Sequence, residues 1–224
     1  MRAIKPGEIA CFLSLLGLIV LLGVGSTALL LGRLPLGDFR GVLLVLAGVV
    51  LTYLWAFLAY RLFLRAMPLR EGPVAPGSRD AFAANVNILF YLMLFNALIR
   101  THFLPVPLMR LVYLALGARL GANTYSAGVL LDPPLTRIGA NTIIGHDAVI
   151  FAHVIEGSRM ELKSVTIGDG ATIGATAVVM AGVSIGDGAI VSAGAVVAKD
   201  TRIAAGEVWG GIPARRLKGP AGAP

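Results

Sequence analysis

The chain has 224 residues, of which 57% are hydrophobic and only 14% are charged, and its mean hydropathy is +0.83. This composition is too apolar for an ordinary soluble domain and indicates that part of the chain lies in a membrane. The net charge of +7 would suit nucleic acid, but the charges are few and several flank apolar segments, so an anionic membrane surface and an acidic cofactor fit better than nucleic acid. The single cysteine, Cys11, excludes an intramolecular disulfide and a cysteine-rich zinc site.

Two uncharged apolar segments open the chain. Residues 9–32 are long enough to cross a hydrocarbon core of about 30 Å. Residues 41–60 are again uncharged, and aromatic side chains gather toward their end like an interfacial belt. Because a second apolar segment follows directly, the first is a retained anchor rather than a cleaved signal peptide. We therefore expect a two-helix transmembrane anchor over residues 1–66.

The basic residues indicate an orientation. Arg2 and Lys5 precede the first apolar segment and four arginines follow the second, whereas Arg33 and Arg40 lie in the loop between them. By the positive-inside rule this excess places both termini in the cytoplasm, although the two loop arginines weaken the case. We expect a multi-pass protein of a bacterial-type inner (cytoplasmic) membrane with its C-terminal part on the cytoplasmic side.

A linker and further helices come next. Residues 67–80 are rich in Pro, Gly and charge, and either Ser78 or Asp80 can cap the apolar helix expected over residues 81–99. A third span would place the C-terminal part outside the cell. We favour instead a helix that lies in, or dips into, the membrane interface, within an interfacial helical segment over residues 81–119.

From Ile138 to Val208 the chain repeats with a period of six. The hexads are IGANTI, IGHDAV and IFAHVI, then, after an eleven-residue insert, IGDGAT, IGATAV, VMAGVS, IGDGAI, VSAGAV, VAKDTR and IAAGEV. A bulky aliphatic residue opens each hexad, and Ala, Thr or Val usually sits fifth. This period predicts a parallel β-helix, in which a hexad forms one flat face, three hexads close a coil, and stacked coils bury a column of aliphatic side chains. Independent strands would not keep a strict period of six.

The repeat resembles the left-handed parallel β-helix of hexapeptide-repeat acyltransferases over about residues 120–217, and the left hand rests on that resemblance alone. The preceding run FNALIRTHFLPVPLMRLVYLALGARLGANTYSAG, followed by LDPPLTRIG, resembles membrane-linked hexapeptide proteins, including the terminal domain of some peptide synthetases and certain exopolysaccharide acetyltransferases. The expected fold is therefore an N-terminal transmembrane α-helical hairpin plus interfacial helices, followed by a left-handed parallel β-helix of about four coils. Residues 218–224 form a tail.

His153 lies just before the insert at residues 156–166, which has no rung to fill and must leave the coil as a loop. Acyl transfer from a thioester needs a base, and imidazole titrates near neutrality. The resembled family carries a histidine in that role, followed in the synthetase-type branch by a glutamate three residues later, as Glu156 follows here. The resemblance implies that His153 is the general base and that Glu156 orients it. A histidine that merely caps a corner is the alternative.

Two further residues are candidates for contact with substrate. His146 sits third in its hexad, and the corresponding residues in the next two coils, Ala175 and Ala193, are small enough to leave space beside it. A solvated or packed histidine is an equal alternative. Arg159 in the insert suits a negatively charged substrate, or belongs to a solvated loop. His102, outside the repeat, needs no function.

The last hexads resemble the acyl-thioester end of the family. There the pantetheine arm of coenzyme A lies between subunits against coil backbone, which favours small residues, and cations meet its phosphates. The stretch WGGIPARR resembles the closing loop near the nucleotide. The residues expected to bind the cofactor are Ala181, Gly182, Ser192, Lys199, Trp209, Pro213, Arg215 and Arg216.

The resemblance implies a membrane-anchored acyltransferase that moves an acyl group, with acetyl expected, from coenzyme A to a hydroxyl or amine. The acceptor would be a membrane-associated lipid or lipid-linked glycan, the enzyme a homotrimer, and no metal is expected. One alternative is a non-catalytic trimeric membrane scaffold. Another is a zinc carbonic-anhydrase-like β-helix, whose metal is held by three histidines across a subunit interface. His146 and His153 are seven residues apart rather than the usual five, and the repeat has no third histidine.

Overall fold

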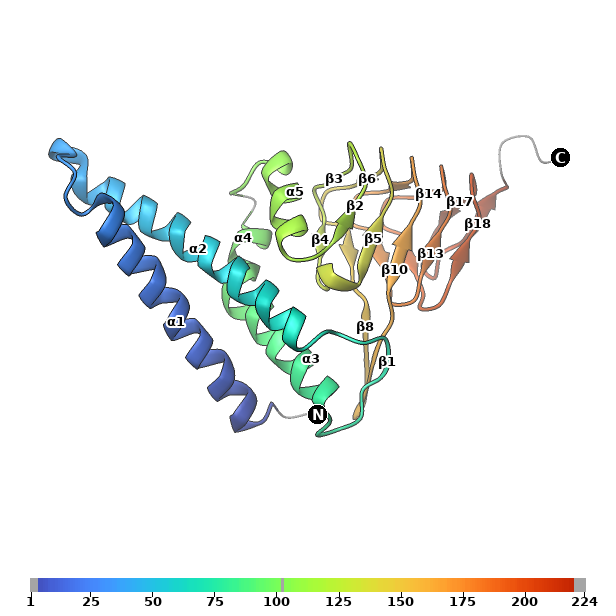
Figure 1. The fold of residues 1–224 in the computed structure, drawn as a ribbon. Helices are drawn as coiled ribbons and strands as arrows, with labels where there is room; N and C mark the ends of the chain where they lie inside the picture. Colours follow the sequence, from blue (N-terminus) through green and yellow to red (C-terminus); the bar gives the residue numbers. More distant parts are fainter. Residues whose placement is uncertain (1–3, 102, 220–224) are drawn as a thin grey trace.

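The computed structural model describes residues 4–101 and 103–219, so His102 and most of the expected tail lie outside the described residues. Helices occupy the N-terminal part and a stack of short parallel strands the C-terminal part (Figure 1). The fold class expected from the sequence, long apolar helices followed by a parallel β-helix, is confirmed.

Two long helices form an antiparallel hairpin at the N-terminus (Figure 1). Helix α1 (Pro6–Leu31) begins before the apolar segment 9–32, and helix α2 (Arg40–Ala66) extends beyond the apolar segment 41–60 at both ends. They approach closely because Gly23 has no side chain: a Cβ there would overlap Thr52. Both helices are long and apolar enough to cross a membrane, and many of their leucine and valine side chains are exposed. An exposed apolar surface of this kind suits lipid contact.

A third long helix packs beside this hairpin. It consists of α3 (Arg79–Phe90), a π-helical turn (Tyr91–Phe95) and α4 (Asn96–Arg100). Ser78, rather than Asp80, caps it, since its Oγ accepts the backbone N–H of Ala81 at 3.1 Å. By length and composition the segment 79–100 is also a candidate span. Ring contacts join the three helices, through Phe12, Phe57, Tyr60, Phe90 and Phe95.

Both ends of this third helix are attached to the β-helix domain. Before it, the segment expected as a plain linker contains strand β1 (Gly72–Pro73), which pairs with the hairpin described below. After it, helix α5 (Val106–Ala115) packs on the first coil, where the buried Tyr113 hydroxyl donates to the carbonyl of Gly128 at 2.8 Å. Arg110 of the same helix donates to the carbonyl of Thr124 at 2.8 Å.

The parallel strands form three sheets, in the orders β2-β5-β10-β13-β16, β3-β6-β11-β14-β17 and β4-β7-β12-β15. They make four complete coils and the start of a fifth, in agreement with the expected number. Strand β18 (Arg215–Lys218) returns antiparallel on β17 and closes the stack. The other strands are β2 (Arg119–Leu120), β3 (Tyr125–Ser126), β4 (Val129–Leu130), β5 (Thr136–Ile138), β6 (Ile143–Ile144), β7 (Val149–Ile150), β10 (Val165–Ile167), β11 (Thr172–Ile173), β12 (Val178–Val179), β13 (Ser184–Ile185), β14 (Ile190–Val191), β15 (Val196–Val197), β16 (Arg202–Ile203) and β17 (Val208–Gly210).

The hexad pattern maps directly onto the coil. Opening residues stack in register, as Ile144, Ile173 and Val191 do, and each of these three is at most 1% exposed. The fourth residue of a hexad makes the corner with a positive φ, for example 53° at Asn141 and 61° at Gly170. This conformation suits Gly, Asn and Asp, which explains why those residues recur at the fourth position.

The eleven-residue insert leaves the coil, as expected, but it is not an irregular loop. Together with the residues before it, it forms the hairpin of β8 (His153–Glu156) and β9 (Arg159–Leu162), which turns at Gly157 with φ +63°. Strand β1 pairs with β9, so β9 is the middle strand and β8 an edge strand of a three-stranded antiparallel sheet. This sheet extends away from the coils (Figure 1). Backbone pairing therefore gives the insert a fixed shape.

Candidate active site

His153 lies at the point where the chain leaves the second coil to enter β8. Its hexad position, the fourth, is a positive-φ corner in other hexads, but here the backbone continues into the extended hairpin instead. The imidazole Nδ1 lies 2.6 Å from Asp132 Oδ2. The Asp132 side chain is 5% exposed and that of His153 27% exposed, so the carboxylate is buried while part of the imidazole reaches solvent.

The coil itself positions Asp132. Strand β4 pairs with β7, which places Asp132 one coil below Ala152, and the Ala152 N–H donates to the same Oδ2 at 2.8 Å. The carbonyl of Asp132 accepts the Thr136 hydroxyl at 2.9 Å and thereby fixes the short 3-10 turn Pro133–Leu135. The buried Oδ2 of Asp132 thus accepts the Ala152 N–H and lies within hydrogen-bond distance of the imidazole Nδ1.

This pair sets the protonation of the site. The hydrogen bond to Asp132 is the main cause that raises the pKa of His153 above its usual value, burial opposes it, and the charge of Asp132 adds to it. When the imidazole is neutral, a proton on Nδ1 is held by Asp132, so Nε2 carries the free lone pair. The arrangement can accept a proton at Nε2 and stabilise the imidazolium that results.

The expected pairing of His153 with Glu156 is wrong. Glu156 is at the far end of β8, where its carboxylate pairs with Lys199 from the fourth coil. Side chains alternate along a strand, and three positions separate the two residues, so they leave opposite faces of β8. The partner of the histidine is Asp132, which sequence reasoning missed because it precedes the regular hexads. The sequence feature that could have indicated this partner is the acidic residue before two prolines in LDPPLTRIG, one coil before the histidine.

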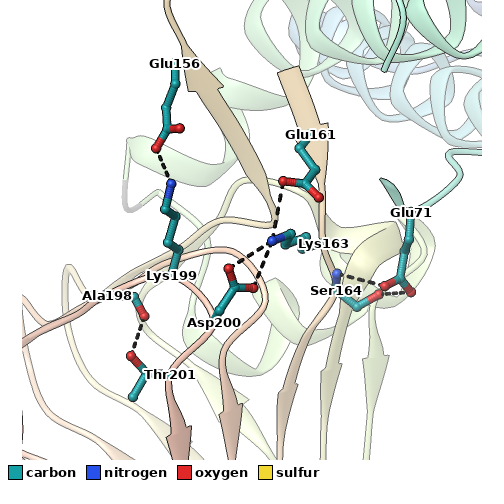
Figure 2. A network of polar contacts seen from close by, with 9 residues as sticks. All are labelled: Glu71, Glu156, Glu161, Lys163, Ser164, Ala198, Lys199, Asp200 and Thr201. Atoms are coloured by element: carbon teal, nitrogen blue, oxygen red, sulfur yellow. Dashed lines mark hydrogen bonds and ion pairs between the residues drawn. The ribbon is translucent and has the colours of Figure 1, made fainter. Parts of the chain in front are cut away.

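A network of charged side chains fixes the hairpin to the coils (Figure 2). Lys163, just after β9, donates to both carboxylate oxygens of Asp200 at 3.1 and 2.9 Å and lies 3.4 Å from Glu161. These partners raise the pKa of Lys163. Ser164 contacts Glu71 through both its hydroxyl and its N–H, which ties the segment before β1 to the same corner.

Three of the expected cofactor residues meet at this corner. Ala181 is fully buried, and its carbonyl accepts the N–H of Asp200 at 3.0 Å. Gly182 has φ +76°, and a Cβ there would lie 2.3 Å from Asp200 Oδ1. Its small size is therefore already required by the Lys163–Asp200 pair. Lys199 forms an ion pair with Glu156 of β8. This corner therefore attaches the hairpin to the coils, and it also contains the small residues expected at the cofactor site.

The remaining expected cofactor residues lie on the last coil, around a buried carboxylate, except Ser192, which lies one coil below Trp209. Glu207, 6% exposed, accepts Trp209 Nε1 at 2.8 Å and the Ala204 N–H at 3.0 Å, and contacts Arg216 at 3.2 Å. These contacts, Trp209 first, lower the pKa of Glu207. Ser192 packs beside Gly210. Glu207 was also missed, although its signal is visible: it stands fifth in IAAGEV, where other hexads place Ala, Thr or Val.

Pro213 and Arg215 belong to the turn and strand that close the stack. Pro213 follows a cis peptide bond after Ile212, and Arg215 is exposed at the start of β18 with Nη1 3.3 Å from the Ala214 carbonyl. Both arginines of the expected loop thus lie on the outer surface of the last coil. That is an accessible place for phosphate groups.

His146 occupies a different corner. It precedes β7 whereas His153 follows it, so the two histidines lie at opposite edges of one face. Ala175 and Ala193 follow it in the next coils, as expected. The imidazole Nε2 lies 3.2 Å from Asp147, and the residue lines a pocket of about 270 Å³ between Met109 of α5 and the first coil. Arg159 is exposed opposite Glu156 in the hairpin.

The donor set was tested against a three-histidine zinc site. Over residues 4–101 and 103–219, no three His, Cys, Asp or Glu side chains converge in a way that could hold a metal ion. One ring nitrogen of His153 already contacts Asp132, and His146 lies at the opposite edge of the same face of the β-helix. The described residues of one chain therefore do not fit such a site.

Comparison with known proteins agrees with this fold. Residues 164–199 match the family described as Bacterial transferase hexapeptide (six repeats). A hexapeptide-repeat acetyltransferase from Vibrio cholerae has a TM-score of 0.51 at 20% identity, covering 69% of this chain and 98% of its own. A structure of a Vibrio cholerae hexapeptide-repeat acetyltransferase with acetyl coenzyme A is 29% identical, with a TM-score of 0.42, over 46% of this chain and 60% of that one.

Among curated proteins, the mitochondrial gamma carbonic anhydrase 2 of Arabidopsis thaliana is 39% identical over 97 residues, and gamma carbonic anhydrase 1 is 42% identical over 83 residues. These stretches are 43% and 37% of this chain, which spans only 30% and 26% of the two relatives. The C-terminal part of the chain thus has the hexapeptide-repeat β-helix of bacterial transferases, with distant carbonic anhydrase relatives.

Proposed function

We propose that the protein is a membrane-anchored acyltransferase that moves an acetyl group from acetyl coenzyme A to a hydroxyl or amine of a membrane lipid or lipid-linked glycan. The observation that carries the proposal is the His153–Asp132 pair, with a buried carboxylate on Nδ1 and a partly exposed ring. General-base catalysis of acyl transfer uses a histidine in this arrangement, with one ring nitrogen held by a carboxylate and the other able to accept a proton.

In the reaction, Nε2 of His153 takes the proton of the acceptor hydroxyl or amine as that atom attacks the thioester carbonyl. Asp132 keeps the imidazole in one tautomer and stabilises the imidazolium. His153 then returns the proton to the departing sulfur of coenzyme A, so the site ends as it began. We assign the exposed Arg215 and Arg216 at the last coil to the phosphates of coenzyme A. The same proposal gives Trp209, Pro213, Ser192 and Lys199 a place in the coenzyme A site.

The attachment of the third helix supports a cytoplasmic β-helix on a two-span anchor. Strand β1 pairs with the β8–β9 hairpin just before α3, and α5 packs on the first coil just after α4. A spanning helix would separate its ends by a hydrocarbon core of about 30 Å. One rigid β-helix contacts both ends, which favours a helix that remains on one side of the membrane.

A column of apolar side chains supports the proposal of a homotrimer. The outward positions of the second sheet align Tyr125, Ile143, Thr172, Ile190 and Val208 in successive coils. Ile143 is 58% exposed and Ile190 42% exposed. Outward aliphatic residues in one column form a flat lateral surface that a neighbouring subunit would bury. Native mass spectrometry of the detergent-solubilised chain measures the stoichiometry.

The test of the function uses purified full-length protein, labelled acetyl coenzyme A and a membrane lipid extract. His153→Ala should lower the rate of transfer by about 10² to 10⁴. His146→Ala is the matched histidine variant and should act on the KM for the acceptor more than on kcat. Mass spectrometry of lipids and glycans from cells with and without the protein identifies the acceptor by an acetyl increment. Unchanged transfer in His153→Ala would exclude it as the base, and no transfer to any lipid or glycan would favour the scaffold.

A carbonic-anhydrase-like activity is the second candidate, because the two gamma carbonic anhydrases match 43% and 37% of the chain. The described residues of one chain do not fit a three-histidine site. Zinc content and CO₂ hydration of the purified protein decide between the two. Stoichiometric zinc with CO₂ hydration and no acetyl transfer would replace our first proposal.

A further inference from the structure

An arginine-rich pocket lies where α2 meets the first coil of the β-helix. It has a volume of about 390 Å³. Arg61 and Arg65 reach it from the last turns of α2, and Arg119 reaches it from β2. Apolar side chains such as Leu69 and Pro134 complete the wall, and no acidic side chain is among the described lining residues.

The three guanidinium groups find no acceptor among the described residues. Within the part of the chain that the structure describes, none of them forms an ion pair or a hydrogen bond, whereas Arg110 and Arg216 do. Arg61 lies against the backbone of Gly117, where a Cβ would be 2.9 Å from its Nη1. Guanidinium groups gathered without an anion repel one another, so their convergence indicates a site for one.

A fourth arginine supports the inference that this region binds an anion. Arg137 on β5 is the direct register partner of Arg119 on β2, and like charges in that position destabilise a sheet. Arg137 lines an adjoining groove that shares Arg119 and Leu114 with the pocket. The dipole of α2 would favour basic residues at its end, but it does not account for two arginines on the β-strands.

We propose that this pocket binds the phosphate of an anionic phospholipid headgroup. Guanidinium groups bind phosphate through paired N–H donors. The pocket adjoins the end of an apolar helix, which is the depth at which headgroups begin, and its apolar wall suits the first carbons of the lipid. Pro134 belongs to the turn that starts at Asp132, so a bound lipid would support the base of the catalytic pair. The proposal does not depend on the acyltransferase activity.

The experiment is native mass spectrometry of the full chain released from mixed micelles that contain either phosphatidylglycerol or phosphatidylcholine. The wild type should retain phosphatidylglycerol in preference to phosphatidylcholine. The triple variant Arg61→Gln, Arg65→Gln, Arg119→Gln should bind phosphatidylglycerol at least about tenfold more weakly. The matched control Arg33→Gln, Arg202→Gln, Lys218→Gln removes the same charge from other exposed positions and should bind as the wild type does.

Further arms separate the lipid from other phosphates. Coenzyme A and inorganic phosphate are added as competitors, and displacement of the lipid by either at micromolar concentration would overturn a lipid site in favour of a soluble ligand. The triple Arg→Lys variant keeps the charge but loses the paired N–H donors, so it should bind more weakly than the wild type and more tightly than the Gln variant, and an unchanged circular dichroism spectrum of the Gln variant shows that its loss is not misfolding. Equal retention of both lipids, or full binding by the Gln variant, would also overturn the proposal.

Discussion

At the scale of single residues, the contact between His153 and Asp132 determines what the site can do. The buried carboxylate selects the tautomer and raises the pKa of the imidazole, so the neutral base forms at a higher pH than it does in a free histidine. In stability terms, the raised pKa stabilises the folded state below the ordinary pKa of histidine. That contribution is lost as the pH rises through the folded value.

Asp132→Asn tests this assignment. The amide removes the charge, so we expect the acid limb of the pH–rate profile for acetyl transfer to move to lower pH while the maximal rate falls by at least about tenfold. Glu156→Gln, which alters a residue paired with Lys199, should leave that limb in place. The profiles of kcat against pH for the two variants make the comparison. An unmoved limb in Asp132→Asn would contradict the role of Asp132.

Glu207 leads to a second prediction at this scale. Its folded pKa is lowered by Trp209, Ala204 and Arg216, so its stabilising contribution is present above the usual glutamate pKa and lost as the pH falls through the lowered value. In a Trp55→Phe background, the fluorescence of Trp209 should change on acidification with a midpoint below the usual glutamate range. Glu207→Gln should abolish that transition. A midpoint at the ordinary glutamate pKa would show that the contacts do not form.

At the scale of elements, the hexad fixes which side chains are buried. Ile185 is 2% exposed, while its neighbour Ser184 on the same strand is exposed. Ile185→Ala should lower the free energy of unfolding by about 2 to 4 kcal/mol, because it leaves a cavity in the column. Ser184→Ala should change it little. Thermal unfolding followed by circular dichroism in detergent measures both, and equal effects would refute the assigned register.

The β-helix also shows which structural features can be predicted from the sequence. The period of six predicted the buried column, the corners and the place where the chain leaves the coil, because each depends on local residue type at fixed spacing. It did not predict the β8–β9 hairpin, the added strand β1, or the partner of His153. The added strand and the histidine's partner depend on residues far apart in the sequence, such as Asp132 with His153 and Glu71 with Ser164, that meet only after the coils stack. Contacts between residues so far apart cannot be predicted from a local sequence pattern.

At the scale of the whole molecule, the helices and the β-helix are joined at several points, and these joints constrain the membrane topology. The loop after α1 contains Asp38, and the segment after α4 contains Thr101, both exposed. If α1 and α2 alone cross the membrane, Asp38 lies on the outer side. Thr101 then lies with the hairpin residue Ser158 on the inner side.

Single cysteines test this topology. In a background with Cys11→Ala, we introduce Asp38→Cys, Thr101→Cys or Ser158→Cys and label intact spheroplasts with a membrane-impermeant maleimide. Asp38→Cys should react directly, and the other two only after permeabilisation, because one rigid β-helix contacts both ends of the third helix. Labelling of Thr101→Cys and Ser158→Cys together with Asp38→Cys, without permeabilisation, would mean that α3 and α4 cross the bilayer and that the β-helix lies on the outer side. Strand β1, which precedes the third helix, would then have to separate from β9, which follows it.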